Sequence, residues 1–118
     1  MSDYDNIPEI QLKISTKVLS YAQAKDASFS FDPFTIMAIC NCIISVVKLL
    51  YMCYSSKGVA KAIRSGSVLH RIMLKREIRK RFTSKSQRRA MFNAMLEAGA
   101  SLSEMELTQL INSIEEQK

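Results

Sequence analysis

The residues that could ligate a metal are few and widely separated. Cys40, Cys42 and Cys53 lie in one apolar stretch, and the one histidine, His70, lies in a basic segment further along the chain. On a helix Cys40 and Cys42 point to different sides, so a zinc site, which takes four ligands, is not expected. An odd number of cysteines does not indicate a secreted disulfide framework, and buried reduced thiols are the simpler interpretation. The sequence therefore predicts no metal and no cofactor.

Catalysis is not expected either. It requires a nucleophile with a base, paired carboxylates or a metal, and a phosphate-binding loop requires clustered glycines. The acidic residues instead gather toward the two ends of the chain, and the three glycines are far apart. His70 stands in a basic run, where we expect it on a helix surface rather than acting as a general base. The sequence predicts a non-enzymatic protein.

Positive charge is the strongest signal in the sequence. The chain carries a net charge of +6, and residues 57–89 hold twelve Lys or Arg against one Glu. Residues 1–56 are nearly neutral, and residues 90–118 hold five Glu and one Lys. Such a concentration of cations favours an acidic partner: nucleic acid, an anionic membrane or an acidic protein surface. A solvated helix face is the simpler alternative, but the C-terminal acids are too few to offset the excess of cations.

Residues 67–82 are predicted to form a basic amphipathic helix. Arg71, Lys75 and Arg79 fall on one face at four-residue spacing, and Leu74, Ile78 and Phe82 fall on another. A row of cations of this kind can neutralise successive phosphates. The predicted contacts to nucleic acid or to an acidic subunit are Arg71, Lys75, Arg76, Arg79, Lys80, Arg81, Arg88 and Arg89.

Base-specific reading is not expected of this chain. Residues 93–111 have the outline of a helix-turn-helix, but the second helix carries Glu104 and Glu106, which phosphates repel. Phe82 and Phe92 are too few to predict a platform for stacked bases. Contact with phosphates alone fits the basic helix better.

The most apolar helix is predicted to begin at Pro33 and to extend through residues 34–54. Asp32 is a good N-cap acceptor, and the proline ring suits the first helical position. About twenty apolar residues are also enough to cross a bilayer. Asn41, Ser45 and Lys48 form a polar stripe that favours a buried central helix, so the membrane span remains the alternative.

The remaining segments predict further helices, and the whole chain is expected to be one all-α domain of five or six helices. Residues 1–31 hold an N-terminal helix from about Pro8 to Ala24, with a short strand as its alternative, and an extended linker. We expect helix breaks at all three glycines, Gly58, Gly66 and Gly99, a helix over residues 85–98 and another from Glu104. This last helix should begin at a capping box of Ser103 and Glu106. Its apolar face, predicted as a contact between copies, comprises Leu107, Leu110, Ile111 and Ile114.

The order of these parts resembles that of small uncharacterised proteins of tailed phages, marine ones in particular. The similarity covers about residues 29–117 and is carried by "FDPFTIMAICNCIISVVKLL", "SVLHRIMLKREIRKRF" and the short acidic helix after a glycine. It implies a viral origin and a virion component, and it supplies no activity or site residues. The N-terminus shows no basic segment followed by an apolar one, so no signal peptide is expected.

Charge, periodicity and resemblance together predict a small helical structural or assembly protein of the virion or the host cytoplasm. It would form homo-oligomers or contact other virion proteins, and opposite charges on the middle and the C-terminal end would allow contacts between copies. Its basic helix would bind nucleic acid without sequence specificity, or an acidic subunit. The alternative is a single-pass protein of the host inner membrane, of holin or ejection type, with the basic segment on anionic lipid.

Overall fold

The chain folds into six α-helices in the computed structural model, which describes residues 6–116, and no strand occurs among those residues. The helices are α1 (Glu9–Lys25), α2 (Pro33–Cys53), α3 (Ser56–Ser65), α4 (Val68–Arg81), α5 (Lys85–Ser101) and α6 (Glu104–Glu115). The all-α prediction is confirmed, and the N-terminal segment is a helix rather than a strand. Residues 1–5 and 117–118 of the predicted terminal segments lie outside the described residues.

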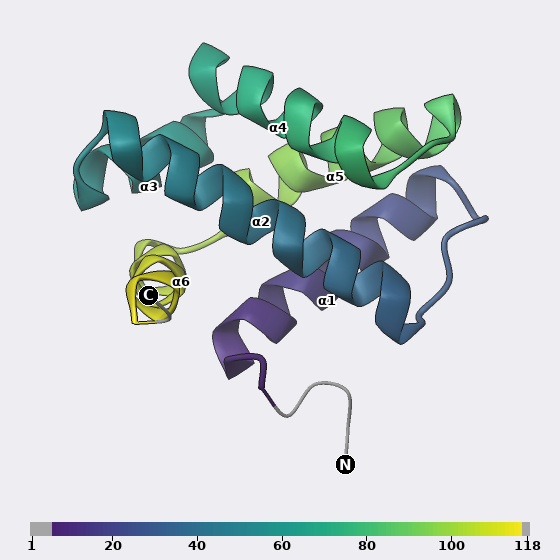
Figure 1. Cartoon of the computed structure of the whole chain (residues 1–118), viewed down its shortest axis with the longest axis horizontal. Coiled ribbons are helices and arrows are strands. Elements are labelled where there is room, and N and C mark those ends of the chain that lie inside the picture. The colour runs from purple at the N-terminus through teal and green to yellow at the C-terminus, as the bar shows by residue number, and fades with distance from the viewer. Residues whose placement is uncertain (1–5, 117–118) are drawn as a thin grey trace.

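The helices pack in crossing pairs around one core (Figure 1). α1 and α5 form the most extensive contact, α2 crosses α1 and lies against α4, and α4 also packs on α5. α6 closes the opposite side by packing on α1, α2 and α3. Leu19, Ile39, Met91 and Leu107 are fully buried where these helices meet. The basic helix α4 therefore packs against both α2 and α5.

Side-chain caps fix two of the predicted helix starts. The Asp32 carboxylate accepts a hydrogen bond from the Thr35 amide at 2.7 Å, and Pro33 is the first residue of α2. At α6, the Ser103 hydroxyl accepts from the Glu106 amide at 3.1 Å, and the Glu106 carboxylate accepts from the Ser103 amide at 3.0 Å. These bonds satisfy amides that the helices leave unpaired, as the sequence predicted.

Two of the three glycines do not break helices. Gly66 does, because it ends α3 with a left-handed φ of 63°. Gly58 lies in the first turn of α3 and Gly99 lies inside α5, so the predicted breaks there are wrong. A Cβ on Gly99 would lie 3.0 Å from Ile63 Cγ2 and 3.2 Å from the Ile63 carbonyl oxygen. Gly99 therefore serves the close approach of α3 to α5 rather than a turn.

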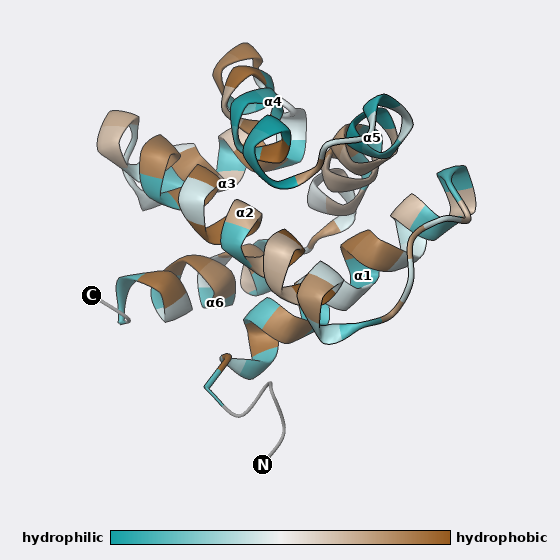
Figure 2. Ribbon diagram, turned by 45° about the vertical axis from the view of Figure 1, so that its right-hand side comes forward, coloured by the Kyte–Doolittle hydropathy of each residue, from teal (hydrophilic) through white to brown (hydrophobic). Residues whose placement is uncertain are grey.

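Helix α2 packs on four of the other helices, α1, α3, α4 and α6, but its outer face is open. Ile39, Cys42 and Leu50 are completely buried, whereas Phe34 is 89% exposed and Met52 is 83% exposed. Figure 2 shows that the apolar residues of this helix are interrupted by hydrophilic ones, and Asn41 and Lys48 are also exposed. The length and composition of Pro33–Cys53 would also suffice to cross a membrane.

The apolar face of α6 belongs to the core of the single chain. Leu107, Leu110, Ile111 and Ile114 are 0–3% exposed, because α6 lays this face against α1, α2 and α3. The prediction that these four residues form a contact between copies is therefore corrected. A change at Leu107 would affect the stability of one copy before it affected any assembly.

Candidate nucleic-acid interface

Helix α4 divides its side chains between the core and two differently charged sides. Leu74 and Ile78 are buried, and Phe82, which follows the helix, packs edge-on against Phe29 with ring centroids 6.0 Å apart. This anchoring confirms the predicted apolar face of the basic helix. It also fixes which cations face α5 and which face α2.

The side of α4 that faces α5 forms an open groove with a volume of about 540 Å³. We call it the α4–α5 groove. Five of its lining residues are cations, none is acidic, and the lining comprises Lys75, Ile78, Arg79, Lys85, Arg88, Arg89 and Phe92. Figure 2 shows hydrophilic residues gathered where α4 ends and α5 begins, which is the same end of the molecule.

Helical spacing brings the lining residues onto facing surfaces. Lys75 and Arg79 are four residues apart on α4, and Lys85, Arg88 and Phe92 follow at intervals of three and four on α5. The start of α5 is set by the Ser84 hydroxyl, which accepts from the Gln87 amide at 3.4 Å. The short turn between the helices thus places two cationic rows opposite each other.

The single acid of the basic run, Glu77, points away from this groove. Its carboxylate pairs with Lys80 Nζ at 3.0 Å and with Arg81 Nη1 at 3.2 Å, and Arg81 Nη2 donates to Ser45 Oγ of α2 at 3.2 Å. Burial opposes ionisation of Glu77, but the two cations outweigh it and lower the pKa of this carboxyl. Because residues two apart lie on different faces of a helix, Glu77 neutralises the α2 side, and neither Lys75 nor Arg79 forms an ion pair with an acid of residues 6–116.

The structure therefore separates the eight predicted contact residues. Lys75, Arg79, Arg88 and Arg89 line the groove together. Lys80 and Arg81 are engaged by Glu77 instead. Arg71 donates from Nε to the Gly66 carbonyl at 2.9 Å, and the exposed Arg76 does not line the groove.

Sequence reasoning missed two residues of the groove. Lys85 is not among the contacts that the sequence predicts, and the sequence predicts no base contact for Phe92. The signal that could have found both is their spacing from Arg88, which places all three on one face of α5.

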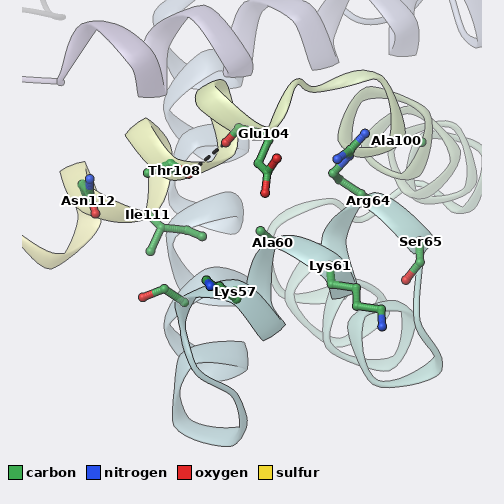
Figure 3. Close-up of a pocket in the computed structure, with 11 residues that line it drawn as sticks. Lys57, Ala60, Lys61, Arg64, Ser65, Ala100, Glu104, Thr108, Ile111 and Asn112 are labelled. Carbon is green, nitrogen blue, oxygen red and sulfur yellow. Dashed lines mark hydrogen bonds between the residues drawn. The ribbon is translucent and has the colours of Figure 1, made fainter.

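Two other grooves of the molecule differ from this one because they contain acids. The groove between α1 and α5 holds the ion pair of Lys25 and Glu97, with Nζ and Oε2 2.9 Å apart. The pocket between α3 and α6 is lined by three cations of α3 and by Glu104 of α6. Figure 3 shows Arg64 and Glu104 entering it from the two helices. The other α3 cations of this pocket are Lys57 and Lys61.

His70 lies in the core rather than on the helix surface, which corrects the prediction made for it. It is 4% exposed and borders a cavity of about 40 Å³ that all six helices line with apolar side chains. Neither ring nitrogen has a hydrogen-bond partner among the described residues. Burial, with a smaller contribution from the neighbouring Arg71, lowers the pKa of His70 to about 4.

The cysteines divide between core and surface. Cys40 and Cys42 are buried as predicted, and burial raises the pKa of Cys42 to about 12, so its thiol stays protonated. Cys53 is exposed at the end of α2, so the prediction of burial is wrong there. Among residues 6–116 no three His, Cys, Asp or Glu side chains gather as a metal site.

The chain matches none of the protein-family models, curated proteins or solved structures with which it was compared. The chemistry of the α4–α5 groove is the feature of the molecule that indicates a function. The resemblance to tailed-phage proteins stays a prediction.

Proposed function

We propose that this protein binds the phosphate backbone of nucleic acid in the α4–α5 groove, as a small non-enzymatic structural or assembly protein. The observation that carries the proposal is the convergence of five cations from two helices in one open groove without an acidic lining residue. Like charges that line one groove repel one another, and bound phosphates relieve that repulsion. Each neutralised phosphate also releases counterions, which favours binding at low salt.

The chemistry of the groove supports backbone contact without sequence reading. The helices that carry the cations are anchored in the core by their apolar faces, while the long side chains of Lys75, Arg79 and Arg89 are exposed. Lysine and arginine bind phosphate oxygens irrespective of the base. An acidic subunit surface could use the same charges, and the test below separates the two partners.

Two triple variants with equal charge change test the proposal. The groove variant combines Lys75→Gln, Arg79→Gln and Arg88→Gln, and the control variant combines Lys57→Gln, Lys61→Gln and Arg64→Gln in the α3–α6 pocket. Fluorescence anisotropy with a labelled duplex gives the dissociation constant across a salt series. The salt slope is the slope of the logarithm of the binding constant against the logarithm of salt concentration. Since each lost phosphate contact lowers its magnitude by roughly 0.9, the magnitude should be roughly 2 to 3 smaller for the groove variant than for the wild type.

The control variant should keep most of the wild-type salt slope, because its cations share a pocket with Glu104 and lie outside the groove. Circular dichroism checks that both variants remain helical. Equal weakening by the two variants would mean that net charge, and not the groove, governs binding. If the wild type binds neither the duplex nor a single-stranded oligonucleotide in a salt-dependent way, nucleic acid is removed as the partner and an acidic protein is left.

Assembly into several copies, as a virion component, belongs to the same proposal. Its support is the charge pattern alone, because the apolar face of α6 is used inside each copy. The exposed acid Glu104 and the cations of α4 are on different helices. Glu104 of one copy could therefore contact the α4 cations of a second copy. Sedimentation at low and high salt measures this contact, which should weaken as salt is raised.

A membrane role is the second candidate, and the open face of α2 is the observation that favours it. Phe34 and Met52 are 89% and 83% exposed on a helix long enough to span a bilayer. Spanning would require α2 to leave the core, which would uncover Ile39, Cys42 and Leu50 and the partners they pack against. That cost favours the folded domain over a single-pass protein.

Fractionation of the protein expressed alone separates the two candidates. The folded domain should stay in the supernatant, and Lys48→Glu should leave it there because Lys48 is exposed on the outer face of α2. A spanning helix should remain in the membrane pellet through high salt and carbonate, and the same substitution should impair its insertion.

A further inference from the structure

Phe92 lies in the α4–α5 groove among the five cations, and we propose that it stacks against an unpaired base. The groove would then prefer single-stranded nucleic acid over duplex. This inference rests on the proposed function and names the kind of nucleic acid that the groove takes. Its ligand is a flexible chain of alternating phosphates and aromatic bases.

The positions of the cations and the ring suit such a chain. Lys75, Arg79, Lys85 and Arg89 are the exposed lining residues, which we call the rims, whereas Phe92, which we call the floor, is partly buried and packs against the core. A duplex presents phosphates on its outside and keeps its bases stacked inside, so it reaches the rims only. A single strand can place a phosphate on a rim and turn its base toward the floor.

One face of the Phe92 ring is already occupied by a cation. Lys75 Nζ lies over the ring, 5.3 Å from its centroid. A base that takes this place would free the ammonium to bind a phosphate. An exposed cation–π contact changes affinity by roughly 2- to 5-fold, and stacking of a base on an aromatic side chain by roughly 5- to 150-fold. The exchange therefore favours the bound strand.

The other aromatic residue of the basic region cannot serve in this way. Phe82 is 8% exposed and its ring packs edge-on against Phe29. Phe92 is thus the aromatic residue that lines the groove among the residues the structure describes. One base, rather than a row of bases, is expected to stack.

Substitution of Phe92 tests the inference. Phe92→Leu keeps an apolar side chain against the core and removes the aromatic face. Phe92→Trp keeps an aromatic face and makes it larger. The probes are a labelled oligothymidylate and a labelled duplex, each titrated by anisotropy across the same salt series. Phe92→Leu should weaken oligothymidylate binding roughly tenfold, leave duplex binding within roughly twofold, and leave both salt slopes unchanged. Phe92→Trp should bind oligothymidylate at least as tightly as the wild type.

The outcomes separate this inference from the proposed function. If the wild type binds both probes with steep salt dependence but Phe92→Leu binds oligothymidylate as tightly as the wild type, stacking is wrong and phosphate binding stands. An equal loss for both probes, or Phe92→Trp binding no better than Phe92→Leu, would also overturn stacking. If the wild type binds neither probe, the proposed function fails and the inference fails with it.

Discussion

The buried histidine makes the stability of the fold depend on pH. His70 is 4% exposed, neither of its ring nitrogens has a hydrogen-bond partner among the described residues, and its pKa is about 4. In the unfolded chain the same ring has an ordinary pKa of about 6.5. Between these two values the unfolded state binds the proton and the folded state does not. Acid therefore favours unfolding in this window.

The size of the effect follows from the two pKa values. Linkage gives a loss of about 2 kcal/mol in the free energy of unfolding between about pH 8 and pH 5, and about 3 kcal/mol by pH 4. Below pH 4 this contribution levels off, because the ring is then protonated in both states. Carboxyls with lowered pKa, such as Glu77, contribute a further loss mainly below their ordinary pKa of about 4.5.

Urea unfolding followed by circular dichroism measures the effect. The wild type and His70→Leu are compared at about pH 8 and pH 5, where the carboxyls contribute little. The wild type should lose about 2 kcal/mol between these conditions and the variant should lose almost none. His70→Leu should also be the more stable of the two at pH 5, because it buries no unpaired polar group. Equal losses in the two proteins would refute the assignment of the pH dependence to His70.

Two further predictions concern the packing that holds the groove in place. Leu107→Ala should lower the free energy of unfolding by about 2–5 kcal/mol, since Leu107 is completely buried, and urea titration should show this loss at every protein concentration. A loss of stability that disappears at high protein concentration would instead show that Leu107 contributes to a contact between copies. Gly99→Leu should cost about 1–3 kcal/mol, because even a Cβ would lie 3.0 Å from Ile63 Cγ2 and α3 would have to move from α5. A variant as stable as the wild type would show that the two helices are not held this close.

Local signals predicted the helices well because they act over a few residues. The Asp32–Pro33 start and the Ser103–Glu106 capping box each satisfy amides within one turn, so their effect can be read without tertiary structure. The four-residue spacing of Leu74 and Ile78 likewise identified the buried side of α4.

Features that depend on distant segments could not be predicted. Gly99 resembles a helix end until Ile63 is seen beside it, and His70 resembles a surface residue until the apolar cavity around it is known. The apolar face of α6 indicates burial but not whether the same chain or another copy covers it. Each of these outcomes is decided by packing between helices far apart in the sequence.

The candidate site was predicted in part for the same reason. The sequence identified the cations, but which of them share a groove depends on where α5 lies and on Glu77 engaging Lys80 and Arg81. Lys85 and Phe92 belong to the site because α5 packs on α4, and this packing between helices cannot be read from the sequence.

Mapping the bound strand by NMR tests the central claim most directly. Amide shifts of the isotope-labelled protein are followed as oligothymidylate is added at low salt. The account predicts that the largest changes fall on the lining of the α4–α5 groove, at Lys75, Arg79, Arg88 and Phe92, and fade as salt is raised. Changes centred on Lys57, Lys61 and Arg64 of α3, or no changes at any salt, would contradict it.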